Sequence, residues 1–392
     1  MTRRALLAFV LLLATLTGCA GGGTAATDPT GGPSATTSGA DTSGQAEDSS
    51  DPGEADVPED SGDQAGENAS AGQADEQPPV STVDPHSLTG PATAAQVPAT
   101  EPVATDPDQQ LPVTVTGEDG QEVTIEDTSR MLALDLYGTL AEITVGLGLG
   151  GDLVGRTVSN TQEVLADLPV VTQNGHELNV ESILALQPTF VLMDTTMGPP
   201  EVPEQLRDSG VPVLVVSSER GVDLITEQIQ LVAEALGAPA AGDLLADRFA
   251  SDLDAAHTYV EALTEGWDPL QMVFLYVRGT GSVFFVMGED SGADDLIEHV
   301  GGVDTATESG LADVTPATAE AVIALDPELI ITMTGGLEST GGVQGLLERP
   351  GIAETTAGET ERVVDMADGA VLSFGPSYPA VLTALADAIY QP

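Results

Sequence analysis

The chain has 392 residues, and its 63 acidic and 10 basic residues give a formal charge of −53 at pH 7. This charge excludes nucleic acid and bare anionic lipid surfaces as partners, because both repel an acidic protein. The single cysteine excludes internal disulfide bonds and cysteine metal clusters. The length allows one large or two medium-sized domains together with a tail.

The first residues predict an export signal with a lipid attachment site. Two arginines precede an apolar run over residues 5–17, which is too short to span a bilayer and is typical of a secretory signal peptide. The run ends in Leu-Thr-Gly-Cys, which resembles a bacterial lipobox, where the cysteine becomes the new N-terminus and carries the lipid. We therefore expect residues 1–18 to be removed and Cys19 to be lipidated. The alternative is an ordinary cleaved signal with an incidental cysteine.

Residues 19–108 are predicted to form a disordered acidic tether. They consist almost entirely of Gly, Ser, Thr, Ala, Pro, Asp and Glu, with hardly an aromatic or branched apolar residue. Such a composition buries too little apolar surface to offset the entropy lost on folding. A tether of this kind suits a protein that works at a cell surface.

Residues 109–222 are predicted to form an N-terminal α/β lobe. Alternating residues at 113–116 and 123–125 flank an Asp-Gly pair, a pattern typical of a β-hairpin. A further apolar strand is expected at residues 131–136. The glycine-rich stretch behind it lacks the spacing of a dinucleotide fingerprint, so we interpret it as a helix end and a turn.

Residues 179–192 and 318–331 repeat each other in character. Each segment has a polar cap, a short helix with a glutamate in its first turn (Glu181 and Glu320), a proline stop and a buried strand. An α/β unit that recurs in this way implies two similar lobes with central parallel sheets.

Residues 223–266 are predicted to be the helical connection between the lobes. Apolar residues recur at helical spacing, and a Gly-Ala-Pro-Ala break divides the segment into two helices, of which the second is long. Residues 267–392 then form the C-terminal lobe, which opens with a strand at 271–277. The predicted fold class is α/β, with two similar lobes joined by a long crossover helix.

The lipobox, the repeated lobes and the helical crossover together resemble the helical-backbone class (class III) of substrate-binding proteins of ABC importers. The resemblance covers residues 111–392, and members of that class take up vitamin B12, ferric siderophores and haem. It implies a ligand held in a cleft between two lobes that move little, because a helix links them. It also implies a partner, an ABC permease with its ATPase subunits, and a lipid-anchored position on the extracytoplasmic face of the cell membrane.

Two short motifs narrow the ligand. His176 lies in a Gly-His-x-Leu loop just before the first repeat helix, and Tyr276 opens a Tyr-x-Arg-Gly motif at the end of the first strand of the second lobe. These motifs resemble those of the haem-specific, HmuT-like binding lipoproteins. The resemblance implies that His176 and Tyr276 bind the haem iron from opposite faces and that Arg278 supports the tyrosine.

The chemistry of these residues agrees with that role. Ferric iron accepts imidazole nitrogen and phenolate oxygen, but a free tyrosine ionises only near a pKa of about 10. Arg278 lies two residues after Tyr276, hence on the same face of a strand, and its charge favours the phenolate. The partners of the haem propionates are left open, with Arg156, Arg220 and Arg278 as the arginines near the expected cleft.

The resemblance further implies that one acidic residue on each lobe docks onto arginines of the permease. Glu320 occupies the matching place in the second lobe. In the first lobe Glu201, Glu204 and Glu181 are all possible, and we expect Glu201 to dock. For Glu181 we favour the simpler role of a carboxylate that complements the dipole of its helix.

Other functions predict different patterns. A ferric siderophore or cobalamin would use the same lobes but would need neither the histidine loop nor the Tyr-x-Arg motif. A bare zinc or manganese ion needs three or four converging ligands, whereas His86 lies in the tether, His257 on the crossover helix and His299 at a helix end. The chain has no nucleophile elbow, His-Glu helix motif or phosphate loop, so we predict that it is not an enzyme.

Overall fold

The computed structural model describes residues 83–280 and 283–391. These residues belong to one compact unit, Gln73–Pro392. The predicted signal peptide, the lipobox with Cys19 and the tether up to residue 82 lie outside the described residues. Among the residues that are described, no helix combines the length and the apolar character that a membrane span requires.

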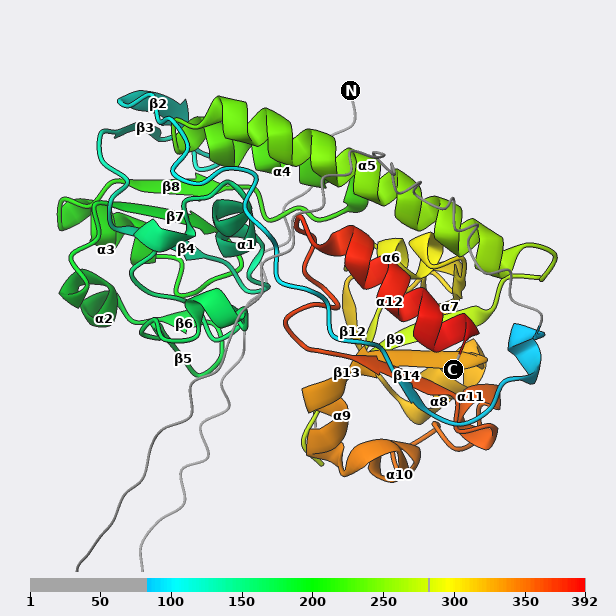
Figure 1. Ribbon diagram of the computed structural model, residues 1–392. Coiled ribbons are helices and arrows are strands. Elements are labelled where there is room, and N and C mark those ends of the chain that lie inside the picture. Colours follow the sequence, from blue (N-terminus) through cyan, green and yellow to red (C-terminus); the bar gives the residue numbers. More distant parts are fainter. Residues whose placement is uncertain (1–82, 281–282, 392) are drawn as a thin grey trace, which may run out of the picture. The chain divides into compact units, whose positions relative to one another are not determined.

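The N-terminal lobe is built on a parallel sheet with the strand order β4-β7-β8 (Figure 1). The side chains of all three strands are buried. Its strands and helices are β4 (Met131–Leu134), α1 (Thr139–Gly146), β5 (Thr172–Gln173), β6 (Glu177–Leu178), α2 (Val180–Ala185), β7 (Phe190–Asp194), α3 (Val202–Asp208) and β8 (Val213–Val216), with short 3-10 turns at Gly150–Asp152 and Glu163–Leu165.

The predicted hairpin precedes this sheet. β2 (Val113–Thr116) and β3 (Glu122–Ile125) pair antiparallel, with Val113 opposite Ile125. The turn between them contains Gly120, whose φ of 74° lies in the left-handed region that glycine adopts without strain. The hairpin predicted from the Asp-Gly pair is therefore confirmed.

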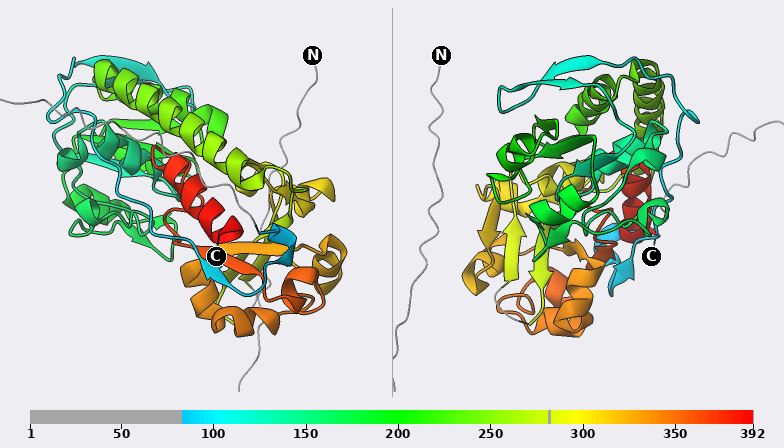
Figure 2. Two further views of the ribbon diagram at one scale, coloured as in Figure 1. Left: turned by 45° about the vertical axis from the view of Figure 1, so that its right-hand side comes forward. Right: turned by 90° about the vertical axis from the view of Figure 1, so that its left-hand side faces the viewer.

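Two helices connect the lobes, as predicted. α4 (Val222–Ala235) ends just before the Gly-Ala-Pro-Ala break, and α5 (Pro239–Thr264) begins with its proline in the first turn, where the missing N–H has no partner to lose. With 26 residues, α5 is the longest helix described, and it packs along α12 (Tyr378–Tyr390) of the C-terminal lobe (Figure 2).

The C-terminal lobe contains a seven-stranded sheet with the order β1-β14-β13-β9-β10-β12, and β11 pairs with β9. β1, β14, β13, β9 and β11 pair in parallel, whereas β10 pairs antiparallel with both β9 and β12, so this sheet is mixed. Its strands are β1 (Ala92–Thr93), β9 (Gln271–Arg278), β10 (Val283–Met287), β11 (Val303–Asp304), β12 (Val314–Pro316), β13 (Leu329–Met333) and β14 (Val363–Met366). Its helices are α6 (Ala293–His299), α7 (Thr305–Glu308), α8 (Ala319–Leu325), α9 (Thr334–Thr340), α10 (Gly342–Leu347), α11 (Thr356–Glu359) and α12 (Tyr378–Tyr390).

The repeated α/β unit recurs in both lobes as α2-β7 and α8-β13. Asn179 caps α2 by accepting the N–H of Ser182 at 2.8 Å, and Thr318 caps α8 by accepting the N–H of Ala321 at 3.2 Å. Both strands that follow are fully buried. The predicted α/β fold with two similar lobes and a long crossover helix is confirmed.

The predicted tether extends too far along the chain, because residues 83–108 are packed against the folded body. β1 joins the large sheet beside β14, and His86 lies 2.8 Å from the carboxylate of Glu328. Backbone bonds make much of this attachment, such as the one from the N–H of Ala94 to the carbonyl of Asp365 at 2.8 Å. Composition reports apolar side chains and not backbone pairing, so it could not reveal this contact.

Candidate ligand-binding site

A cavity of about 490 Å³ is lined by residues of both lobes. It brings together His176 from the N-terminal lobe and Tyr276 and Arg278 from the C-terminal lobe. Its volume falls within the range of small-molecule and cofactor sites, roughly 300–1,000 Å³. Apolar side chains form much of the wall, namely Leu136, Val158, Phe285, Met287, Met333 and Leu372.

Tyr276 and Arg278 lie at the end of β9, where alternate residues of an extended strand share a face. Phe285 of β10 is the register partner of Tyr276 across the antiparallel pair. The guanidinium carbon of Arg278 lies 5.5 Å from the centroid of the Tyr276 ring. The fold thus places a positive charge over the face of this tyrosine.

Arg278 is held by a residue that the sequence did not reveal. Its Nη2 atom lies 2.6 Å from Oδ2 of Asp368, whose Oδ1 accepts the backbone N–H of Gly335 at 2.7 Å. Partial burial lowers the pKa of Arg278, but the ion pair with Asp368 and the neighbouring Tyr276 outweigh burial and raise the pKa above its ordinary value. Arg278 therefore stays cationic, and Asp368 orients it.

His176 lies in the turn of the small hairpin formed by β5 and β6. Asn174 and Gly175 have left-handed backbones, with φ of 50° and 90°, and the side-chain amide of Asn174 donates to the carboxylate of Glu177 at 2.8 Å. The side chain of His176 is exposed and makes no hydrogen bond or ion pair with a described residue. Both of its ring nitrogens are therefore available to a ligand in the cavity.

The other histidines lie outside the lining of this cavity. Nε2 of His257 and Nδ1 of His299 are 2.8 Å apart, with the rings stacked at 4.8 Å, and His86 pairs with Glu328. Within residues 83–280 and 283–391, no group of three or more His, Cys, Asp or Glu side chains is arranged to hold a metal ion.

Of the three arginines considered for carboxylate recognition, only Arg278 lines the cavity. Arg156 instead donates to backbone carbonyls of its own loop, among them that of Asn160 at 3.2 Å. Arg220 pairs with Asp194 at 3.6 Å. Of these three arginines, a ligand carboxylate in this cavity therefore meets Arg278 alone, which is also paired with Asp368.

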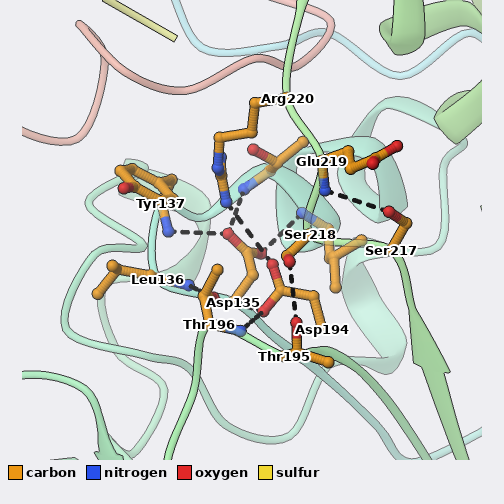
Figure 3. A network of polar contacts seen from close by, with 12 residues as sticks. Asp135, Leu136, Tyr137, Asp194, Thr195, Thr196, Ser217, Ser218, Glu219 and Arg220 are labelled. Atoms are coloured by element: carbon orange, nitrogen blue, oxygen red, sulfur yellow. Dashed lines mark hydrogen bonds and ion pairs between the residues drawn. The ribbon is translucent and has the colours of Figure 1, made fainter. Parts of the chain in front are cut away.

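A network of polar contacts joins the ends of β4, β7 and β8 in the N-terminal lobe (Figure 3). Asp135, just after β4, accepts the backbone N–H groups of Tyr137 and Leu140 at 2.9 Å each. Arg220 reaches Asp194 with one end of its guanidinium, and its guanidinium carbon lies 3.5 Å from the centroid of the Tyr137 ring. Tyr137 in turn lines the cavity.

Burial raises the pKa of Asp194 to about 6, and the negative charge of Asp135 contributes to this rise. Hydrogen bonds from Thr196 and the positive charge of Arg220 lower the pKa but do not cancel the rise. The ordinary value is 3.8, so the folded state binds this proton more tightly than the unfolded state does. The contribution of Asp194 to stability is therefore fully present below about pH 4 and is lost as the pH rises through about 6.

A second buried carboxylate joins the two lobes. Glu142 of α1 is 2% exposed, and its Oε1 accepts the hydroxyl of Thr100 at 2.7 Å and the N–H of Ser377 at 2.6 Å. Its Oε2 accepts the hydroxyl of Ser373 at 3.0 Å. One side chain of the N-terminal lobe thus holds the segment before β2 and the segment before α12.

The glutamates expected to dock onto a permease are all exposed. Glu320 lies in the first turn of α8, and Glu181 lies at the equivalent place in α2. Glu201 instead lies at the N-cap position of α3, where its side chain makes no capping bond, and Glu204 lies in the first turn of that helix. The fold therefore makes Glu181, and not Glu201, the structural counterpart of Glu320.

Two cavity residues, Tyr137 and Asp368, were missed by sequence reasoning. A signal for both was present, because Tyr137 follows β4 and Asp368 follows β14. Ligands of open α/β sheets bind outside the carboxyl ends of the strands. The positions of Tyr137 and Asp368 behind parallel strands are those where this rule expects ligand contacts.

Comparisons with known proteins agree with this geometry. The model of the periplasmic binding protein family matches residues 136–369. The solved structure of the haem-binding protein HmuT is 45% identical, with 79% of this chain and 100% of that chain covered and a TM-score of 0.77. The periplasmic haem-binding protein RhuT from Roseiflexus sp. RS-1 is 35% identical, with coverages of 67% and 98% and a TM-score of 0.62. BhuT, solved in complex with two haems, is 31% identical, with coverages of 66% and 98% and a TM-score of 0.60. No curated protein matches the chain.

Proposed function

Because the chain belongs to the periplasmic binding protein family, we propose that it captures ferric haem between its lobes and delivers it to an ABC importer. The observation that carries this proposal is the single cavity that contains His176, Tyr276 and Arg278. The two proposed iron ligands come from different lobes and lie 100 positions apart in the chain (276 − 176).

The donor set suits ferric haem. Imidazole nitrogen and phenolate oxygen are both ligands of ferric haem iron, and Arg278 places a positive charge over the ring of Tyr276. His176 has no internal partner to give up, so ligation costs it no hydrogen bond within the described residues. The apolar wall suits the body of a porphyrin.

The relatives support the same residues. HmuT has been solved as variants in which a histidine, a tyrosine and an arginine are each replaced by alanine. The tyrosine and the arginine of that protein are two positions apart, as Tyr276 and Arg278 are here. This spacing supports the roles of Tyr276 as iron ligand and of Arg278 as its support.

An absorption titration with hemin tests the proposal. With wild-type protein we expect a Soret band that differs from that of free hemin. Tyr276→Phe is expected to shift the spectrum and weaken binding, and His176→Ala to retain partial binding through the phenolate. His86→Ala and Tyr259→Phe, outside the cavity, are the matched controls. Wild-type protein that leaves the spectrum of free hemin unchanged would instead favour a ferric siderophore or cobalamin as ligand.

Delivery needs a membrane anchor and a docking surface. We assign lipidation to Cys19 and docking to Glu201 and Glu320, and the position of Glu181 in α2 makes it the first alternative to Glu201. Cys19→Ser should abolish incorporation of labelled fatty acid and release the protein from the membrane. Glu201→Ala and Glu320→Ala should lower stimulation of the importer's ATPase and leave the hemin spectrum intact. A loss of stimulation in Glu181→Ala and not in Glu201→Ala would favour the alternative, and Glu234→Ala, exposed on α4, is the control.

A further inference from the structure

Tyr137 lines the same cavity as Tyr276, but from the N-terminal lobe. The backbone around Tyr137 is fixed by Asp135, whose carboxylate accepts the N–H of Tyr137 at 2.9 Å and the N–H of Gly138 at 2.5 Å (Figure 3). Gly138 has a φ of 88°, and a Cβ there would lie 2.9 Å from the side chain of Asn160. The loop that carries Tyr137 is therefore held in one conformation by close contacts.

The ring of Tyr137 is also held, through Arg220. The guanidinium carbon lies 3.5 Å from the ring centroid, which is a cation–π contact over one face of the ring. The side chain of Arg220 is only 10% exposed, and its other partner is the carboxylate of Asp194 at 3.6 Å. One face of Tyr137 is thus covered by a buried ion pair, which leaves the other face, the ring edge and the hydroxyl for the cavity.

The properties of this ring differ from those of an iron ligand. Burial raises the pKa of Tyr137, and the lowering by Arg220 does not cancel that rise, so the phenol is neutral at physiological pH. Its hydroxyl makes no hydrogen bond with any described residue. Tyr137 therefore offers the cavity a rigid aromatic surface and not an anion.

We propose that Tyr137 contacts the porphyrin ring of the bound ligand by aromatic packing, with Arg220 and Asp194 as the residues that position it. The inference rests on the proposed function, since it takes the ligand to be a planar tetrapyrrole. Each lobe then contributes one tyrosine backed by an arginine. Tyr276 with Arg278 serves the iron, and Tyr137 with Arg220 serves the macrocycle.

Metal-free protoporphyrin IX separates the two roles, because it presents the macrocycle without iron. Tyr137→Ala is expected to weaken protoporphyrin and hemin binding by the same factor, about tenfold, the equivalent of an aromatic contact and its buried area. Tyr137→Phe, which keeps the ring, should stay within about twofold of wild type for both ligands. Tyr276→Phe should weaken hemin binding and leave protoporphyrin binding unchanged. Tyr259→Ala, on α5 outside the cavity, is the matched control.

The positioning role has its own readout. The double variant Arg220→Met, Asp194→Asn removes both members of the ion pair and leaves the Asp135 carboxylate with its backbone N–H donors. In this variant protoporphyrin binding should weaken about threefold when Tyr137 is present and not at all in a Tyr137→Ala background. Tyr137→Ala protein that binds protoporphyrin as wild type does would overturn the inference, and so would a loss confined to hemin. Failure of the proposed function is a separate result, because wild-type protein would then leave the spectrum of free hemin unchanged.

Discussion

Glu142 offers the sharpest test of how the two lobes are held together. It is 2% exposed and accepts hydrogen bonds from Thr100, Ser373 and Ser377, which lie 42, 231 and 235 positions away in the chain. Hydrogen bonds to a charged group contribute roughly 1.5–3 kcal/mol each, and a buried donor left without a partner costs about 1–3 kcal/mol. Glu142→Ala removes one acceptor group from three donors at once.

We expect Glu142→Ala to lower the free energy of unfolding by about 4 kcal/mol, since the three bonds share one side chain and are not additive. Glu142→Gln should cost only about 1–2 kcal/mol, because the amide oxygen can still accept from Thr100 and Ser377, and the hydroxyl of Ser373 can turn to accept from the amide nitrogen. We therefore expect the free energy of unfolding to be lowest in Glu142→Ala, intermediate in Glu142→Gln and highest in wild type.

Urea unfolding at pH 7, followed by circular dichroism, measures both variants against Glu234→Ala, an exposed glutamate of α4. The control should stay within about 0.5 kcal/mol of wild type. The reasoning is refuted if Glu142→Ala is no less stable than this control, or if the alanine and glutamine variants unfold together. Weaker hemin binding in Glu142→Ala would further show that this contact keeps the two walls of the cavity in place.

Three further outcomes are expected. In Asp194→Asn, the fall in stability between about pH 4 and about pH 6 should disappear, because the group with the raised pKa is gone. Unfolding measured from pH 4 to pH 8 tests this, and a pH profile equal to that of wild type would contradict it. Gly369→Ala should weaken hemin binding, since a Cβ there would lie 2.3 Å from Oγ1 of Thr161 on the facing wall, and wild-type affinity in a titration would count against this clash. Asp368→Ala should weaken hemin binding about threefold and spare protoporphyrin, because it releases Arg278 from a partly exposed ion pair; an equal loss for both ligands would contradict that role.

Much of the fold followed from short-range patterns in the sequence. The Asp-Gly hairpin, the capped helices before β7 and β13, and the break between α4 and α5 are all where the patterns predict them. Each rests on neighbouring residues alone, such as a polar cap followed by an apolar run. The predicted end of the tether at residue 108 was wrong. β1 joins the large sheet through backbone hydrogen bonds, which the composition of a segment does not reveal.

The proposed binding site also contains some residues that the sequence predicted and others that only the structure revealed. His176, Tyr276 and Arg278 could be found because each belongs to a local motif, and the two residues of the Tyr-x-Arg motif share a strand face by geometry alone. Asp368 lies 90 positions after Arg278 (368 − 278), and Arg220 lies 83 positions after Tyr137 (220 − 137), with no pattern to link either pair. Their contacts exist because separate strands end at the same edge of a sheet, and only the folded chain brings those ends together.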